Sequence, residues 1–260
     1  MAINNRIITI VLPLYKPKGD WARQLVNNIR ELDRFLLDQT SLQYIVVYDD
    51  AADTGLETAF RLITDELGHV CFISYGENRG KGYALREGVK AAGTPYTITL
   101  DFDFPYKKEN LATLVSLLHT DKCDIVVGRR SDGYFQQVPL KRKLMSKGFS
   151  LLNRWLLGLA LSDTQSGMKG FNKRGREVFL QTSIDRFLVD TEFVLRGSRQ
   201  GLVIRAMPID LRSGVSFSNF GFPVLLTELK NFAGLLLLAR TWKTGAGSVK
   251  PYVVETLPVR

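Results

Sequence analysis

The sequence predicts an α/β protein with a mostly parallel central sheet that helices flank on both faces. Short apolar, β-branched runs alternate with longer segments of helical periodicity up to about residue 130. These runs are apolar almost without interruption, which is typical of strands buried on both faces. An apolar share of 45% in 260 residues is enough for a large core, and the chain contains no repeat or low-complexity tract.

The first half of the chain carries this alternation. The apolar runs predict strands at residues 6–15, 42–50, 69–76, 95–103 and 122–130. The segments between them predict helices at residues 21–38, 54–67, 78–93 and 108–120. Ligands bind at the carboxyl ends of the strands in such sheets, and polar residues gather at those ends here. We therefore expect one site at that edge.

After residue 130 the rhythm changes. A loop-like stretch precedes a long amphipathic segment at 141–161, and SDTQSGMKGF follows it. We then expect helices near 173–181 and 189–201, a strand at 202–211 and a strongly apolar helix at 222–240. This pattern predicts one domain over residues 1–220. Residues 221–260 would form an apolar helix and tail that pack on the domain or lie at a membrane interface.

An acidic pair ends the strand expected at 95–103. Alternation along an extended chain would place Asp101 and Asp103 on one side. Two carboxylates so close repel each other unless a cation lies between them. Carboxylates together with phosphate oxygens suit a hard divalent cation, so we expect such an ion beside a diphosphate leaving group. Ordinary surface acids are the alternative.

Two further segments at strand ends suggest ligand contacts. In ENRGKGYALREG, Gly80 and Gly82 would let a ligand approach the backbone while Lys81 adds positive charge. An ordinary helix start explains the same residues. Asp49 and Asp50 would accept hydrogen bonds from a base or ribose, or would cap the helix expected near residue 54.

The chain carries a net charge of +9, which favours an anionic partner. Residues 129–154 hold seven basic residues and one acid, mixed with Trp, Phe and Leu. This mixture suits peripheral contact with a membrane, and an interior helix with basic ends is the alternative. No nucleic-acid-binding module accompanies the charge, so we expect no nucleic-acid partner.

The expected location is the cytoplasm, with peripheral contact to the inner face of the membrane. Cys71 and Cys123 lie in strand-like runs, which predicts buried, reduced thiols. The first residues lack the pattern of a signal peptide. The apolar runs at 7–14 and 231–239 are shorter than the ~20 residues that cross a bilayer.

Several motifs in consistent order resemble one known family. IVLPLY, VVYDD, ENRGKGYALREG, TLDFD, VVGRR, DTQSGMKGF and the DTEF…RSGVS series resemble a family-2 glycosyltransferase, over roughly residues 6–220. The likeness is greatest to the branch of dolichyl- or polyprenyl-phosphate mannosyl- and glucosyltransferases. It implies the GT-A, or nucleotide-diphospho-sugar transferase, fold. It also implies inverting transfer of a sugar from a UDP- or GDP-sugar to a lipid phosphate, with Mg or Mn.

The resemblance also implies residue roles. Asp103 would be the main metal ligand, and Asp101 would face the ribose or the metal. The remaining donor-pocket residues would be Pro13, Tyr15, Asp49, Asp50 and Lys81. The acceptor phosphate would be held by Arg130, Arg142, Ser146, Arg212 and Ser216.

Four residues, at three places in the sequence, depart from the family pattern. Lys16 stands where the family has Asn, and Ala51-Ala52 replaces the usual Gly-Ser. Pro105 stands where the lipid-phosphate branch has a metal-contacting Gln. The metal shell would then be completed in another way or by water, and the nucleobase stays undetermined.

The acceptor decides whether a general base is needed. A hydroxyl acceptor would have to lose its proton, and Asp163, Asp190 or Glu192 would take it. A phosphate monoester is already ionised near neutral pH, because its second pKa is ~6. Structural roles are the alternative, as a turn cap for Asp163 and an arginine partner for Glu192.

Three other functions stay open at this point. Transfer to a hydroxyl of a saccharide or other acceptor would keep the donor site and change the acceptor. A catalytically silent nucleotide-sugar-binding protein would keep the donor site alone. A nucleotidyltransferase would need a glycine-rich triphosphate loop after the first strand, and LYKPKGDW has a single glycine.

Overall fold

The computed structural model describes residues 7–50, 56–131, 134, 148, 163–164, 166–215 and 222–241. In this part of the chain the strands form one sheet of order β3-β2-β1-β4-β6-β5-β7. The strands are β1 (Ile7–Leu14), β2 (Ser41–Asp49), β3 (Val70–Tyr75), β4 (Tyr96–Thr99), β5 (Ile125–Arg130), β6 (Lys169–Phe171) and β7 (Ile204–Ile209). The helices are α1 (Trp21–Leu36), α2 (Glu57–Glu66), α3 (Lys81–Ala91), α4 (Lys108–His119), α7 (Lys173–Phe179), α8 (Val189–Arg199) and α9 (Phe222–Thr241).

The mostly parallel sheet is confirmed, with one exception. β1 pairs in parallel with β2 and β4, β2 with β3, and β5 with β7. β6 runs antiparallel between β4 and β5. The sequence did not suggest β6, because a strand of three residues with a central glycine has no apolar run. The glycine at position 170 leaves room for α4, since a Cβ atom there would lie 2.5 Å from Leu114 Cδ2 and would displace that side chain.

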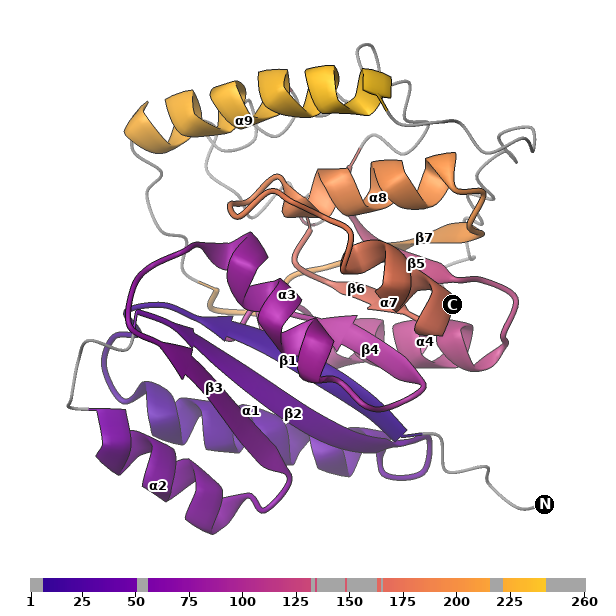
Figure 1. Ribbon diagram of the computed structural model, residues 1–260. Helices are drawn as coiled ribbons and strands as arrows, with labels where there is room; N and C mark the ends of the chain where they lie inside the picture. The colour runs from indigo at the N-terminus through magenta and orange to yellow at the C-terminus, as the bar shows by residue number, and fades with distance from the viewer. Residues whose placement is uncertain are drawn as a thin grey trace.

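Helices cover both faces of the sheet (Figure 1). α1, α2 and α4 lie on one face, while α3, α7 and α8 lie on the other, and α9 packs outside α8. Alternate side chains of β1 pack against the helices on the two faces of the sheet, because successive residues of a strand point to opposite faces. Ile8 and Ile10 pack with Leu25 of α1, whereas Val11 packs with Leu85 of α3.

The amphipathic helices form as their spacing predicts. In α1, the buried residues recur every three or four positions and include Trp21, Leu25, Ile29, Leu32 and Leu36. In α9, Phe232, Leu235 and Ala239 are buried in the apolar cluster that contains α8, whereas Leu237 is 64% exposed. None of the helices described here combines the length and apolar character required to cross a membrane.

Two details of the sequence analysis are wrong. The strand expected at 95–103 ends at Thr99, so the acidic pair lies beyond the sheet in a turn. Cys123 is buried as expected, but Cys71 is exposed, because β3 is an edge strand. The amphipathic segment at 141–161, apart from Gly148, lies outside the described residues.

Candidate active site

The carboxyl edge of the sheet gathers the residues that the sequence singled out. β2, β1 and β4 are neighbours and run in parallel, so Asp49 at the end of β2, Tyr15 after β1 and Asp101 after β4 lie at one edge. Arg130 ends β5, which is parallel to β7 and is separated from β4 by β6. These residues therefore lie at one edge of the sheet, as expected, and their common role in binding a ligand stays a prediction.

Asp101 and Asp103 belong to a tight turn, not to an extended strand. The Phe104 amide donates to the Asp101 carbonyl at 3.0 Å, and Phe104 has a φ of 48°. The prediction that simple strand alternation sets the two acids on one side is therefore wrong. A cation does lie against the pair, because Lys81 Nζ is 2.6 Å from Asp101 Oδ1.

Asp103 is the exposed acid of this turn. Although it reaches solvent, the surrounding protein and the negative charge of Asp101 raise the pKa of its carboxyl. Arg212 offsets part of this effect and donates to the Asp103 carbonyl at 2.8 Å. Asp103 is thus an incompletely compensated carboxylate at the sheet edge.

These two acids fit a divalent cation that also has substrate ligands. Among the described residues, no group of three or more His, Cys, Asp or Glu side chains is arranged to hold a metal. Mg²⁺ does not need one, because one or two carboxylates, substrate phosphates and waters complete its shell. Asp103, with the carboxylate of Asp101 beside it, provides that minimum.

Asp49 holds the glycine-rich turn in place. Its buried carboxylate accepts hydrogen bonds from the amides of Arg79 and Gly80, at 2.7 and 2.8 Å, and from Asn78 Nδ2 at 2.9 Å. This carboxylate therefore positions the start of α3. Its expected contact with a base or ribose stays a prediction.

Residues 184–186 of the chain, and not a ligand, pack against the two glycines of that turn. A Cβ atom on Gly82 would lie 2.2 Å from the Ile184 carbonyl, and one on Gly80 would lie 2.5 Å from the Asp185 carbonyl. The Gly82 amide already donates to the Asp185 carbonyl at 2.7 Å. The expected approach of a ligand to these glycines is wrong, because residues 184–186 occupy that space.

The rim beyond β1 and β2 has a strained backbone. Lys16 and Asp50 have φ values of 40° and 104°, and their side chains form an ion pair of 3.5 Å. Lys16 Nζ also lies 5.2 Å from the centre of the Tyr15 ring, and Pro13 is half-buried beside Val47. Non-glycine residues in such conformations cluster at functional sites. Their placement is consistent with a binding edge.

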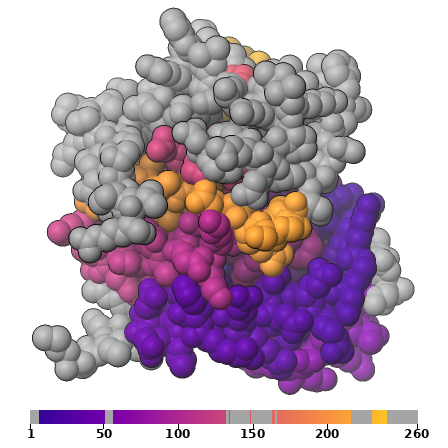
Figure 2. Space-filling view, turned by 180° about the vertical axis from the view of Figure 1, so that it is seen from behind, coloured from indigo at the N-terminus to yellow at the C-terminus, as the bar shows by residue number. Residues whose placement is uncertain are grey.

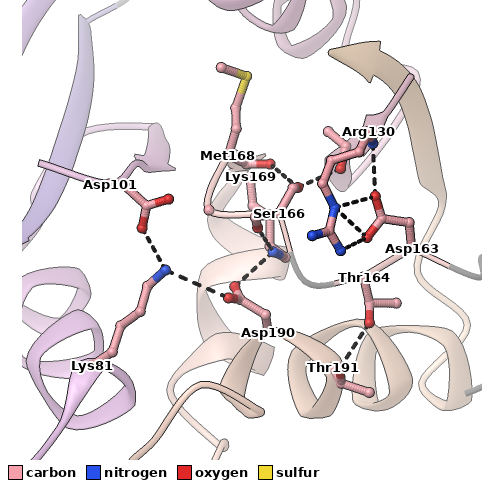
Figure 3. A network of polar contacts seen from close by, with 12 residues as sticks. Lys81, Asp101, Arg130, Asp163, Thr164, Ser166, Met168, Lys169, Asp190 and Thr191 are labelled. Carbon is pink, nitrogen blue, oxygen red and sulfur yellow. Dashed lines mark hydrogen bonds and ion pairs between the residues drawn. The ribbon is translucent and has the colours of Figure 1, made fainter. Parts of the chain in front are cut away.

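Beneath the acidic turn lies a set of alternating charges, Asp101, Lys81, Asp190 and Lys169, of which Asp190 and Lys169 are buried (Figure 3). Lys81 Nζ lies between Asp101 Oδ1 at 2.6 Å and Asp190 Oδ2 at 4.0 Å. Lys169 Nζ lies 2.7 Å from Asp190 Oδ1 and also donates to the Ser166 carbonyl. Asp190 is thus shared by two lysines.

Burial affects the two lysines differently. Burial alone would lower the pKa of Lys81, but Asp101, Asp190 and Asp103 raise it above its ordinary value. Burial lowers the pKa of Lys169, and Asp190 offsets only part of that effect. Lys169 therefore depends on Asp190 more than Lys81 does.

Arg130 and Asp163 bind each other. Asp163 accepts from Arg130 Nε at 2.9 and 3.1 Å, from Nη2 at 2.5 Å and from the Arg130 amide at 2.8 Å. Burial would lower the pKa of Arg130, but the bonds to Asp163 raise it. The residue predicted to hold a phosphate and the residue predicted to take a proton are thus partners (Figure 3).

Glu192 is fully buried in α8 and binds the chain before it. Its oxygens accept from the amides of Ser183 and Ile184, at 2.9–3.0 Å, and from Arg196 Nε at 2.9 Å. The arginine partner, which was the structural alternative for Glu192, is present. This arrangement stabilises the segment before α8 and leaves Glu192 the least accessible of the three candidate bases.

Arg212 is the exposed cation beside the acidic turn. Its amide donates to the Pro105 carbonyl, and the Lys107 amide donates to the Asp210 carbonyl. In the view from behind, orange residues lie against magenta residues, so late and middle parts of the chain are neighbours on this face (Figure 2). Three residues predicted to hold the acceptor phosphate, Arg142, Ser146 and Ser216, lie outside the described residues.

Sequence reasoning missed the role of SGMK in DTQSGMKGF. A Cβ atom on Gly167 would lie 2.0 Å from Asp101 Oδ2, so the absence of a side chain makes room for that carboxylate. The Gly167 amide donates to the Tyr106 hydroxyl at 3.0 Å. The available signal was a lysine, Lys169, in the short stretch MKGF, where Met168 and Phe171 are apolar and no other charge occurs.

Comparisons with known proteins find one matching family model and several relatives. The family model described as "Glycosyl transferase family 2" matches residues 9–179. Glycosyltransferase AglD of Haloferax volcanii is 26% identical over 208 residues, which are 78% of this chain and 32% of that protein. The dolichyl-phosphate beta-glucosyltransferase of Dictyostelium discoideum is 22% identical over 222 residues, which are 80% of this chain and 67% of that protein. The chain thus spans about a third of the Haloferax protein.

Solved structures share the fold at low identity. Glucosyl-3-phosphoglycerate synthase from Mycobacterium tuberculosis, in complex with UDP, has a TM-score of 0.62 and 20% identity, over 93% of this chain and 83% of that chain. A mannosyltransferase from Pyrobaculum calidifontis, with GDP-Man and Mn²⁺, has a TM-score of 0.58 and 16% identity, over 92% and 65% of the two chains. The expected GT-A-type fold is thereby confirmed.

Proposed function

Because the chain belongs to glycosyl transferase family 2, we propose that it moves a sugar from a nucleoside diphosphate to the phosphate of a polyprenyl or dolichyl lipid. The donor would be a UDP- or GDP-sugar at the carboxyl edge of the sheet. The names of relatives such as the Dictyostelium enzyme support the lipid phosphate as acceptor. The fold neighbour with UDP supports a nucleotide donor.

The choice of acceptor rests on the state of the three candidate bases. Asp163 is bound to Arg130, Asp190 to Lys169, and the oxygens of Glu192 accept backbone amides. A hydroxyl acceptor needs a base that is ready to accept a proton. A phosphate acceptor needs none near neutral pH, because its second pKa is ~6. The paired acids therefore favour a phosphate.

The proposed reaction is an inverting displacement. An oxygen of the acceptor phosphate attacks the anomeric carbon while the bond to the nucleoside diphosphate breaks on the opposite side. Arg212, exposed beside Asp103, would orient the acceptor phosphate through charge-assisted hydrogen bonds. A divalent cation held by Asp103 with Asp101 would supply positive charge for the departing diphosphate. Asp49 would hold the backbone of residues 79 and 80 in place at the edge of the donor pocket.

A transfer assay tests this function. UDP- and GDP-sugars would be supplied with Mn²⁺ to three acceptors: polyprenyl phosphate, a small phosphorylated acid and a free saccharide. We expect product only with polyprenyl phosphate, with inverted anomeric configuration. Product on the saccharide hydroxyl would contradict the proposal, and nucleotide-sugar binding without any transfer would indicate a silent binding protein.

Arg212→Gln sharpens this assay, with Arg61→Gln on the exposed surface of α2 as its control. Loss of one charge-assisted bond to the acceptor should raise the acceptor KM about tenfold or more. The donor KM should rise less, because Arg212 donates to the carbonyl of Asp103 and not to its carboxylate. The Arg61 variant should match the parent in both constants. Equal acceptor KM values for the two variants would remove Arg212 from the acceptor site.

Peripheral membrane contact is part of the same proposal. The basic excess in residues 129–154 and the exposed Leu237 of α9 support it. In flotation experiments, the chain should bind vesicles that contain anionic lipid and should be released as salt increases. Equal binding to neutral vesicles, or none to either kind, would argue against contact driven by charge.

A further inference from the structure

Lys169 is a lysine with no solvent exposure at the centre of the fold. It begins β6 and lies opposite Thr99, the last residue of β4, only two positions before Asp101. A buried ammonium group costs several kcal/mol unless it is paired. The Lys169 ammonium group therefore needs an acidic partner in this buried position beneath the acidic turn, and that partner is Asp190.

Asp190 has two lysines within reach but is much nearer to one of them. Its Oδ1 is 2.7 Å from Lys169 Nζ, whereas its Oδ2 is 4.0 Å from Lys81 Nζ. Lys81 is in turn 2.6 Å from Asp101. The arrangement assigns one lysine to each carboxylate, although Lys81 lies between the two.

We infer that Lys169 is a positioning residue, which keeps Lys81 on Asp101 by pairing with Asp190. Opposite charges attract more strongly where the dielectric is low, and Asp190 is only 4% exposed. Without the Lys169 ammonium, Asp190 would draw the flexible Lys81 side chain toward itself. Asp101 would then lose the contact that orients it.

The segment that contains Lys169 also holds Asp101 sterically. Gly167 leaves the space that Asp101 Oδ2 occupies, and its amide is bound to the Tyr106 hydroxyl. Asp101 is therefore held on one side by Lys81 and on the other by the backbone of residue 167. Both supports depend on residues 166–169, so this short segment determines where the carboxylate lies.

Two variants test the inference through the position of Lys81. Lys169→Met keeps an unbranched side chain of similar length and removes the charge. Lys169→Met/Asp190→Asn also removes the carboxylate that would attract Lys81. In crystal structures, Lys81 Nζ should lie within about 3.2 Å of Asp190 in the single variant and should return to Asp101 in the double variant. Lys81 remaining on Asp101 in the single variant would overturn the inference.

Nucleotide binding provides the second measurement, and only this step depends on the proposed function. In calorimetry with UDP or GDP and Mn²⁺, the single variant should bind the nucleotide about tenfold more weakly, because the charge-assisted contact between Lys81 and Asp101 is lost. The double variant should bind within about threefold of the parent. An equal loss of nucleotide affinity in both variants would overturn the inference. The loss would then come from the absence of Lys169 itself and not from displacement of Lys81.

The two measurements separate failure of the inference from failure of the function. A parent chain that binds neither nucleotide contradicts the proposed function, while the position of Lys81 still decides the inference. If Lys169→Met leaves Asp190 unpaired and does not fold, Lys169→Gln takes its place, because its amide can still donate to Asp190 without carrying a charge. Lys81 remaining on Asp101 in Lys169→Gln would overturn the inference.

Discussion

At the scale of single residues, the site depends on where side chains are absent as much as on where they are present. Asp101 and Asp103 could be selected from the sequence, because two acids after an apolar strand are a local pattern. Lys169 and Gly167 could not be assigned roles, because their partners Asp190 and Asp101 lie elsewhere in the chain. The acidic turn itself was mistaken for extended strand.

Replacing Gly167 with alanine should displace Asp101. The new Cβ would lie 2.0 Å from Asp101 Oδ2, so the carboxylate must move, although the end of a side chain can move at modest cost. We expect about 1 kcal/mol lower stability in urea unfolding and about tenfold weaker nucleotide binding. Gly93→Ala is the control, because no atom lies within 4 Å of its Cβ position. Normal binding by Gly167→Ala would show that Asp101 need not stay in place.

At the scale of elements, the alternation of strands and helices was predictable because each element carries its own periodicity. β6 was not, since its position depends on pairing with β4 and β5 and not on its three residues. The contact of α3 with residues 184–186 was equally hidden. Arg86 of α3 donates to the Ile184 carbonyl, which is 98 residues later. Such contacts leave no local pattern beyond the glycines that permit them.

Gly82→Ala tests that contact between elements. Its Cβ would lie 2.2 Å from the Ile184 carbonyl, and backbone cannot yield as a flexible side chain can. We expect a loss of about 2 kcal/mol or more in the free energy of unfolding, measured in urea. Gly93→Ala again serves as the control and should stay within about 0.5 kcal/mol of the parent. Equal stability of the two variants would mean that residues 184–186 do not pack against α3.

At the scale of the whole molecule, the fold buries ionisable groups in both helical layers and at the site. Burial raises the pKa of Tyr44, Tyr75 and Tyr106 above the ordinary value of 10, with nearby Asp33, Asp49 and Asp101 as further causes. The folded state therefore keeps these phenols protonated when the unfolded chain ionises. Their contribution to stability is complete below pH 10 and is lost as the pH rises beyond it.

Alkaline unfolding should show this loss. Ionisation of each of these three phenols in the unfolded chain should lower the free energy of unfolding by about 1.4 kcal/mol between pH 9 and pH 11. In Tyr44→Phe, the free energy of unfolding should fall by about 1.4 kcal/mol less than in the parent over the same pH range. A parent chain whose stability did not fall above pH 10 would contradict the burial of these phenols.

The central claim is that the acidic turn at the sheet edge binds a nucleoside diphosphate together with a divalent cation. Calorimetric titration of UDP and GDP, with and without Mn²⁺, tests it most directly when the parent is compared with Asp103→Ala and with Asp65→Ala, an exposed acid on α2. We predict that Mn²⁺ strengthens nucleotide binding in the parent and in Asp65→Ala, and that Asp103→Ala folds normally but loses this effect. Binding that is indifferent to Mn²⁺ in the parent, or equally dependent on it in Asp103→Ala, would contradict the account.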